Sequence, residues 1–155
     1  MNKANLIKDI TTAWEARIAE LKKAVVTSQE MTKDTPGRIE SRYDSSREEM
    51  GWLTTGLGVA LGEMEHAFAM FKAITPVPKS FVALGACFEA IPLYGGKDIR
   101  CFVCHGGGGF DCVGDGKPVT LISPDSPLAK AAFGKSTGDL FTVNDRIDYQ
   151  LTSVA

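Results

Sequence analysis

The residues with the clearest potential for metal or redox chemistry are cysteines. Cys101 and Cys104 are separated by two residues and followed by His105, with Cys87 and Cys112 nearby in the sequence. Four thiolates or a Cys₃His set would be chemically adequate for Zn²⁺. However, both members of the pair fall in a predicted strand, where residues three apart point to opposite faces. No second Cys-x-x-Cys follows, and cysteine is among the most buried residue types. These observations favour packed thiols over a zinc or redox site.

Two glycine-containing segments match phosphate-binding loops only in part. The run 106–109 is not followed by Gly-Lys-Ser/Thr at the required spacing. Gly134-Lys135-Ser136 carries these residue types, but position 129 is Ala where a phosphate-binding loop has Gly. Both segments are predicted turns. His66 and His105 have no nearby Ser or Asp in a nucleophile motif, so we interpret them as surface or packing histidines.

Composition sets limits on partners and compartment. The 155 residues include 17 Lys and Arg against 19 Asp and Glu, a net charge of −2, so the chain has no basic excess for direct DNA or RNA binding. No run of about 18 apolar residues occurs, which predicts that no segment spans a membrane. The N-terminal segment lacks the apolar core of a signal peptide. Four cysteines without an export signal are typical of reduced thiols, so we expect a cytoplasmic protein.

A change in composition near residue 75 divides the chain. Residues 76–155 contain six of the seven prolines and eleven of the sixteen glycines. The segment Thr75-Pro76-Val77-Pro78 is a predicted stiff linker, because each Pro fixes φ and disfavours helix before it. We predict two domains, residues 1–75 and residues 76–155.

The first domain shows seven-residue spacing of apolar positions, which is typical of helices that pack along a seam. The first series consists of Ile7, Trp14, Leu21 and Ser28. Three residues after each of these lies a companion position, occupied by Ile10, Arg17, Ala24 and Met31. Ile18 and Val25 widen this apolar stripe. The second series consists of Tyr43, Met50, Leu57, Met64 and Phe71. Its companion positions, again three residues later, are Ser46, Leu53, Ala60, Ala67 and Ile74.

A turn over residues 32–37 separates the two series. Thr35 is a suitable N-cap and Pro36 fits the first helical position. So short a connection predicts an antiparallel helical hairpin, a coiled coil with its tip near residues 32–40. Gly51, Gly56, Gly58 and Gly62 in the second helix allow either close helix approach or a bend. Trp52 and Phe68 lie off the seam and would pack on the second domain or on a partner.

The second domain alternates between apolar and polar residues, which predicts strands. The expected strands cover residues 80–91, 98–104, 110–113, 118–122, 140–143 and 146–154. One short helix is expected over residues 128–133, with Ser126 as N-cap, Pro127 first and Gly134 as its stop. A domain made mostly of strands, with one helix packed on a face of the sheet, belongs to the α+β class.

The segments Ser126–Asp139 and Arg146–Leu151 resemble the C-terminal domain of the Gre transcript-cleavage factors of bacterial RNA polymerase. Tyr43 and the segment Arg47–Leu53 resemble a stretch in the helical hairpin with which those factors begin. The resemblance implies an FKBP-like fold for the second domain, which would dock at the rim of the polymerase's secondary channel. It also implies that the hairpin enters that channel.

The resemblance also indicates what the hairpin tip does. In cleavage-competent Gre factors an acidic pair at the tip helps to hold a second Mg²⁺, for which carboxylates are suitable ligands. Aligned on Tyr43, the two acidic positions fall on Pro36 and Ile39 in this chain. Asp34 and Glu40 are nearby carboxylates and the remaining tip candidates for catalysis.

We accordingly predict a transcription elongation regulator that binds bacterial RNA polymerase, with weak or no stimulation of transcript cleavage. It would not itself be an enzyme and would carry no cofactor of its own, and any Mg²⁺ would be shared with the polymerase. DNA or RNA would be contacted only through the polymerase. The polymerase-binding residues predicted from the capped turn are Asp125, Ser126, Pro127, Leu128 and Lys130. Further tip candidates are Lys33 and Arg38.

Two alternatives remain open from the sequence. One is an FKBP-like peptidyl-prolyl isomerase or peptide-binding module, which would need a pocket lined by aromatic residues. The other is a zinc- or thiol-based sensor built on the cysteines.

Overall fold

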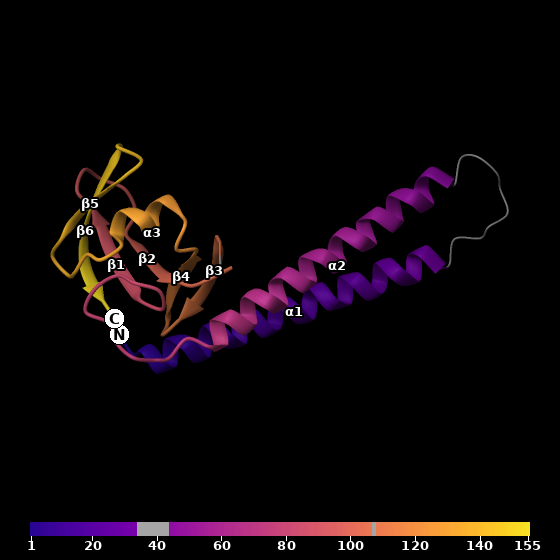
Figure 1. Ribbon diagram of the computed structural model, residues 1–155, viewed down its shortest axis with the longest axis horizontal. Helices are drawn as coiled ribbons and strands as arrows, with labels where there is room; N and C mark the ends of the chain where they lie inside the picture. The colour runs from indigo at the N-terminus through magenta and orange to yellow at the C-terminus, as the bar shows by residue number, and fades with distance from the viewer. Residues whose placement is uncertain (34–43, 107) are drawn as a thin grey trace. The chain divides into compact units, whose positions relative to one another are not determined.

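The computed structural model describes residues 1–33, 44–106 and 108–155, without the side chains of residues 32–33 and 44–50. Packing divides the chain into two compact units, Trp14–His66 and a larger unit made of Met1–Ala13 with Ala67–Ala155. The elements in chain order (Figure 1) are α1 (Lys3–Lys33), α2 (Asp44–Lys72), β1 (Cys87–Pro92), β2 (Ile99–Val103), β3 (Phe110–Gly114), β4 (Lys117–Ile122), α3 (Pro127–Ala132), β5 (Leu140–Val143) and β6 (Ile147–Val154). None of the helices in these ranges is long and apolar enough to cross a bilayer.

The smaller unit, Trp14–His66, contains an antiparallel pair of helices. Lys22 Nζ of α1 lies 3.0 Å from Glu65 Oε1 of α2, and the hydroxyl groups of Ser28 and Thr54 hydrogen-bond across the seam. The earlier residue on α1 therefore meets the later residue on α2, as the predicted hairpin requires. The residues expected at the turn and tip, 34–40, lie outside the described part of the chain.

The seam of this hairpin differs from the predicted one by one residue at four of the companion positions. Four companions expected in the seam are exposed: Arg17, Ala24, Leu53 and Ala60. The residues one position later are buried or half-buried: Ile18, Val25, Thr54 and Leu61. A seven-residue repeat is continued equally well by a step of three or of four. The step of four is adopted here because it turns Ile18, Val25 and Leu61 toward the seam and leaves Arg17 on the exposed side.

The four glycines of α2 face open space. A Cβ built on Gly51, Gly56, Gly58 or Gly62 would meet no described atom within 4 Å. Close approach between α2 and the described part of α1 therefore does not explain them.

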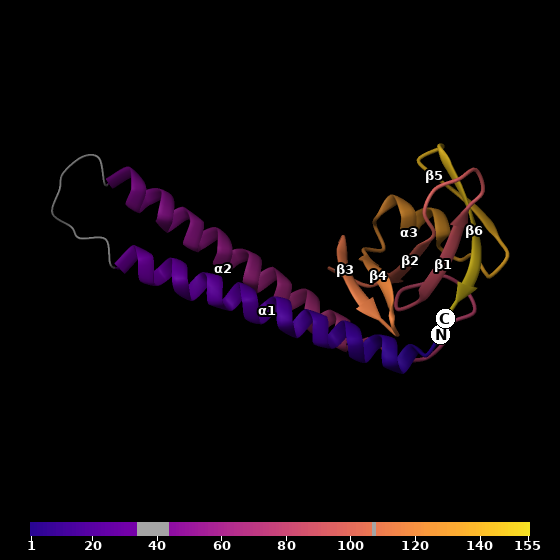
Figure 2. The ribbon, with the colours of Figure 1, turned by 180° about the vertical axis from the view of Figure 1, so that it is seen from behind.

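The larger unit is built on a six-stranded sheet in the order β3-β4-β2-β1-β6-β5, seen from behind in Figure 2. The sheet is mixed, because β2 and β4 are parallel while the other neighbouring pairs are antiparallel. Helices followed by this sheet confirm the predicted α+β class. The FKBP-like description remains a prediction.

The predicted strand over residues 80–91 is shorter in the structure. Only β1 is a strand there, and residue 81 forms an isolated bridge to Ser136. Gly85 adopts a φ of +79° within a turn in which the Ala86 N–H donates to the Ala83 carbonyl. A left-handed residue interrupts an extended strand, so the alternation of apolar residues before Cys87 does not produce one.

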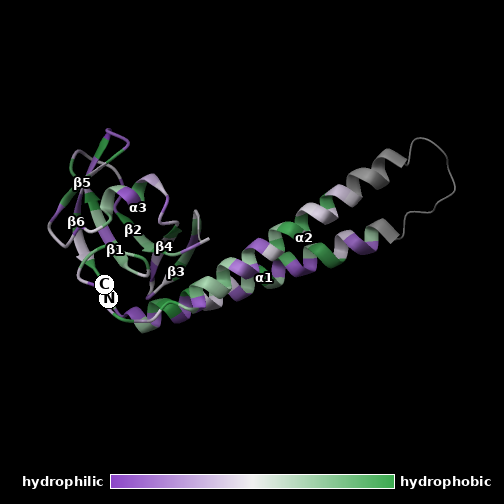
Figure 3. Ribbon diagram, in the orientation of Figure 1, coloured by the Kyte–Doolittle hydropathy of each residue, from purple (hydrophilic) through white to green (hydrophobic). Residues whose placement is uncertain are grey.

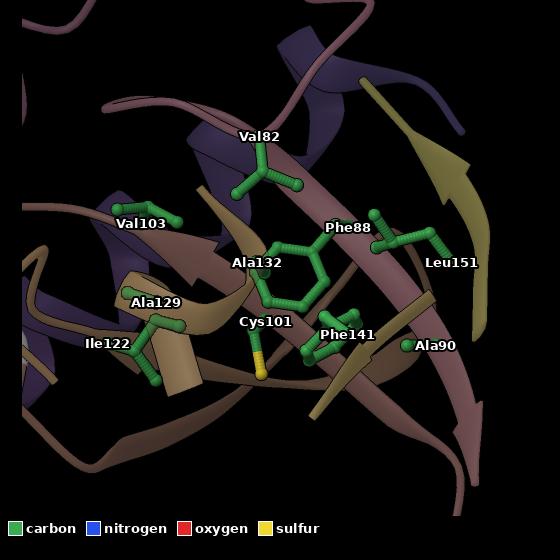
Figure 4. Close-up of a cluster of buried hydrophobic side chains, with 10 residues drawn as sticks. All are labelled: Val82, Phe88, Ala90, Cys101, Val103, Ile122, Ala129, Ala132, Phe141 and Leu151. Carbon is green, nitrogen blue, oxygen red and sulfur yellow. The ribbon is translucent and has the colours of Figure 1, made fainter. Parts of the chain in front are cut away.

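The sheet of the larger unit is packed on both faces. On one face α3 covers a core that includes Phe88, Cys101 and Phe141 (Figure 4). On the opposite face Phe102 of β2 meets Phe71 of α2, with ring centroids 5.6 Å apart. The first turns of α1 and the last turn of α2 thus belong to the core of the larger unit.

Two glycines let the helix ends approach this second face closely. A Cβ on Gly114 would overlap with Leu6 Cδ1 of α1, and a Cβ on Gly106 would overlap with Ala67 Cβ of α2. Leu6 and Phe71 are fully buried.

Candidate functional site

The segment that precedes α3 is a capped turn with the predicted geometry. Ser126 Oγ accepts a hydrogen bond from the Ala129 N–H at 3.2 Å, and the Lys130 N–H donates to the Ser126 carbonyl at 2.9 Å. Pro127, which has no N–H to satisfy, occupies the first helical position. The N-cap and the first residue of α3 predicted from the sequence are confirmed.

The end of α3 also follows the prediction. The Phe133 N–H donates to the Ala129 carbonyl at 2.9 Å, and Gly134 adopts a φ of +76° immediately afterwards. The Gly134 N–H then donates to the Val82 carbonyl at 2.8 Å, which fixes the helix end to the segment before β1. The helix is therefore held at both ends and has little freedom to adjust on binding.

The five predicted docking residues lie together in this turn, but their exposures differ. Asp125, Pro127 and Lys130 are exposed. Ser126 and Leu128 are half-buried, and Leu128 packs against the apolar core. Three of the five can therefore offer their side chains freely to a partner, whereas Ser126 and Leu128 hold the turn in place.

One exposed residue of this surface was not among the predicted docking residues. Phe133 is 50% exposed and lies three positions after Lys130, so the two share a side of the chain at the end of α3. Ala129 and Ala132 are fully buried against the sheet, and the helical period then turns positions 130 and 133 outward. The helical period of α3 is the sequence signal that could have identified Phe133. We name the group Asp125, Pro127, Lys130 and Phe133 the α3 surface.

A groove of about 460 Å³ lies beside Leu128, over the start of β2 and β4. Its apolar lining includes Ala90, Ile99, Cys101 and Pro118, and no aromatic side chain lines it. The isomerase alternative needs an aromatic pocket, and this groove does not supply one.

A buried arginine in the wall of the groove links its own strand, β2, to three others, β1, β3 and β4. The Arg100 side chain is 8% exposed, and its Nη1 donates to the Gly114 carbonyl and, at 3.3 Å, to the Lys117 carbonyl. Its Nε lies 3.1 Å from Glu89 Oε1, an ion pair whose N–H is not aligned for a hydrogen bond. Lys117 Nζ approaches the same carboxylate oxygen at 3.9 Å. The guanidinium of Arg100 in β2 therefore stabilises the β3–β4 turn by hydrogen bonds to the carbonyls on both sides of it.

Burial disfavours the thiolate form of three of the cysteines. Burial raises the pKa of Cys87 to about 11, that of Cys101 to about 12 and that of Cys112 to about 11. Metal binding and nucleophilic attack both need the thiolate. Cys101 lies in β2, whereas buried Cys104 follows the end of that strand. Within the described ranges no three His, Cys, Asp or Glu side chains gather as metal ligands.

The other candidates from the sequence are distributed as follows. Asp34, Arg38 and Glu40 lie outside the described residues, as does the Lys33 side chain. His66 and His105 are exposed. Phe68 is buried, with Lys72 Nζ 4.4 Å from its ring centroid, whereas Trp52 is 74% exposed.

Comparison with solved structures finds bacterial transcription factors at low sequence identity. The structure of GreA factor homologue 1 (Gfh1) of Thermus thermophilus has 13% identity and a TM-score of 0.39, over 94% of each chain. A structure described as the transcription factor Gfh1 has 13% identity and a TM-score of 0.41, over 95% of this chain and 94% of that one. The structure of Gfh1 of Thermus aquaticus has 12% identity and a TM-score of 0.39, over 92% of each chain. No protein-family model and no curated protein matches the sequence.

Proposed function

We propose that this protein is a Gre-like regulator that binds bacterial RNA polymerase and acts on elongation through the polymerase's secondary channel. The observation that carries the proposal is the capped turn before α3. It lies in the segment whose sequence resembles the Gre C-terminal domain, and it presents Asp125, Pro127 and Lys130 to solvent on a fixed backbone.

The geometry of the turn suits recognition of a protein surface. A contact loop that is already ordered loses little conformational entropy on binding. Here the Ser126 cap and the bond from Gly134 to Val82 fix both ends of the helix. Opposite charges on Asp125 and Lys130, with apolar Pro127 and Phe133 between and beside them, give a mixed surface that can discriminate between partners.

The proposal includes occupation of the channel without efficient stimulation of transcript cleavage. The positions at which the family pattern has its acidic pair are Pro36 and Ile39 in this sequence, and neither side chain can ligate Mg²⁺. The protein would then regulate by steric occupation and would not be an enzyme.

Binding to purified core polymerase tests the proposal. Pro127→Ala and Lys130→Glu should weaken the affinity, because one removes a constraint and the other reverses a charge on the α3 surface. Lys97→Glu, at another exposed position of the same unit, is the control for the charge reversal and should bind as the unaltered protein does. Failure of the unaltered protein to bind polymerase would reject the proposal.

A second assay tests the absence of cleavage. Backtracked elongation complexes with a labelled transcript should release little more short RNA with the protein than without it. Substantial release that is lost in Asp34→Ala or Glu40→Ala would show that these carboxylates act at the tip, and would contradict this part of the proposal.

A further inference from the structure

The groove beside Leu128 carries charges of both signs in its lining. Glu89 and Asp98 are acidic while Arg100 and Lys117 are basic, so their formal charges cancel. The volume of about 460 Å³ lies within the range of roughly 300–1,000 Å³ that is typical of small-molecule sites. The proposed function makes no use of this groove.

Two of the four charges compensate each other within the protein. The Arg100 guanidinium donates to the Gly114 and Lys117 carbonyls and lies 3.1 Å from Glu89 Oε1. The Arg100 side chain is only 8% exposed. Arg100 and Glu89 therefore belong to the structure of the wall, and the charged groups left for a ligand are the Lys117 ammonium and the Asp98 carboxylate.

Asp98 and Lys117 occupy equivalent positions at the start of two neighbouring strands. β2 and β4 are parallel, and Cys101 lies opposite Thr120. This register, continued back toward the strand starts, places Asp98 level with Lys117. Both residues are exposed, and within the described ranges they form no ion pair with each other, since Lys117 Nζ approaches Glu89 instead, at 3.9 Å. A carboxylate and an ammonium are thus available side by side at the groove.

Apolar side chains follow directly after these two charges. Half-buried Ile99 comes after Asp98, and Pro118 comes after Lys117. Both line the groove together with Leu128 of α3. Figure 3 shows the same alternation of green apolar and purple charged segments in the sheet of the larger unit. A ligand that matches the groove therefore needs an apolar group next to its charged groups.

The lining disfavours several common classes of ligand. No aromatic side chain of the described residues lines the groove, so it offers neither a stacking platform for a nucleobase nor a ring face for a quaternary ammonium group. The two carboxylates oppose a polyphosphate, because Lys117 is the one lining cation not committed to the wall. Within the described ranges no group of three potential metal ligands is present.

We propose that the groove binds a free α-amino acid with an apolar side chain. The α-carboxylate would contact the Lys117 ammonium, and the α-ammonium would contact the Asp98 carboxylate. The apolar side chain would pack on Ile99, Pro118 and Leu128. A zwitterion satisfies both exposed groups, whereas a ligand with a single charge leaves one of them without a partner. This site lies beyond the proposed function and does not depend on polymerase binding.

Matched ligands separate the three contacts. The full-length protein is titrated with L-leucine, N-acetyl-L-leucine, L-leucinamide and glycine, and NMR shifts give the affinities. N-acetyl-L-leucine lacks the ammonium and L-leucinamide lacks the carboxylate, so each should bind more weakly than L-leucine by up to about fivefold, the upper range for an exposed ion pair. Glycine lacks the apolar side chain and should also bind more weakly.

Variants assign each charged contact to its residue. Lys117→Met should weaken the binding of L-leucine and leave that of L-leucinamide, which has no carboxylate, unchanged. Asp98→Asn should weaken the binding of L-leucine and leave that of N-acetyl-L-leucine unchanged. Lys130→Met and Asp145→Asn, at exposed positions outside the lining, are the matched controls and should bind L-leucine as the unaltered protein does. The unchanged affinity for the second ligand also establishes that each variant is folded.

The positions of the shifted resonances locate the site. L-leucine should shift the methyl resonances of Ile99 and Leu128 but not those of Ile147, an exposed isoleucine outside the lining. The inference is overturned if L-leucine causes no saturable shifts, or if the shifts lie away from Ile99 and Leu128. Equal affinities for L-leucine, N-acetyl-L-leucine and L-leucinamide would also overturn it, because recognition would then not involve the two charges.

Discussion

Ser126 and Ala129 are joined by a hydrogen bond of 3.2 Å from the backbone N–H of Ala129 to the hydroxyl oxygen of Ser126. This bond satisfies one of the free donors at the start of α3, a helix of only six residues. The same bond holds the residues of the α3 surface in place and contributes to the stability of the larger unit.

Ser126→Ala should therefore lower the free energy of unfolding by about 1 kcal/mol, the usual cost of losing an N-cap side chain. Urea unfolding followed by circular dichroism measures this change. Ser136→Ala is the matched control, because Ser136 contacts Asp139 through its backbone N–H, which alanine retains. Equal stability of the two variants would show that the cap contributes nothing.

Arg100→Met should be much more destabilising, by about 3 kcal/mol, the typical cost of removing one partner of a buried ion pair. The substitution would leave the half-buried Glu89 carboxylate without its closest cation and two backbone carbonyls without their donor. Lys117→Met is the contrast, since Lys117 is 68% exposed and 3.9 Å from the same carboxylate. It should change the stability by less than about 0.5 kcal/mol. Similar urea midpoints for both variants would contradict this assignment.

Elements with local signals were predictable from the sequence. Ser126, Pro127 and Gly134 fix α3 through cap chemistry that involves neighbouring residues only, and the observed helix begins and ends where these residues require. The strand at Leu140–Val143 was likewise predicted with its observed bounds, from the local alternation of apolar and polar residues.

Features that depend on distant partners were not predictable. Whether Arg17 or Ile18 enters the hairpin seam is undecided within one heptad and is settled by the facing helix. The role of Arg100 depends on the parallel pairing of β2 with β4, which brings the β3–β4 turn within reach of its guanidinium. Among the predicted docking residues, the packing of Leu128 against the core depends on the sheet beneath α3, which the local sequence does not reveal.

Gly56→Ala should stabilise the protein by up to about 1 kcal/mol, because alanine is the better helix former. The new methyl group would meet no described atom within 4 Å. The melting temperature measures the effect. Gly116→Ala is the opposite case, since Gly116 has a φ of +74°, which an L side chain rarely adopts, and it should lower the melting temperature. A lower melting temperature for Gly56→Ala would indicate that its surroundings are not open.

The stability should fall as the pH rises above 9 because of the buried thiols. Burial raises the pKa of Cys87 from 9.0 to about 11, so between these values the unfolded chain releases a proton that the folded chain retains. The unfolded state is favoured accordingly, while below pH 9 this thiol adds no pH dependence. Urea midpoints from pH 7.5 to 10.5 in the presence of a reductant measure the slope. Cys87→Ala should make the slope smaller, with the rest due to Cys101 and Cys112, and an unchanged slope would show that the Cys87 thiol does not contribute to it.

Gly114→Ala should lower the free energy of unfolding by about 1–3 kcal/mol through overpacking. The added methyl group would overlap with Leu6 Cδ1 and lie 3.3 Å from Val119 Cγ1, and both side chains are buried. Gly108→Ala is the control, because a Cβ at that position would meet no described atom within 4 Å.

A double-mutant cycle with Leu6→Ala identifies the cause of the Gly114→Ala effect. If the overlap with Leu6 is responsible, Gly114→Ala should cost less in the Leu6→Ala background, where the colliding methyl groups are gone. Calorimetric unfolding of the four proteins gives the coupling energy between the two positions. Strict additivity would assign the effect to the strand backbone and would contradict the close approach of α1 to β3.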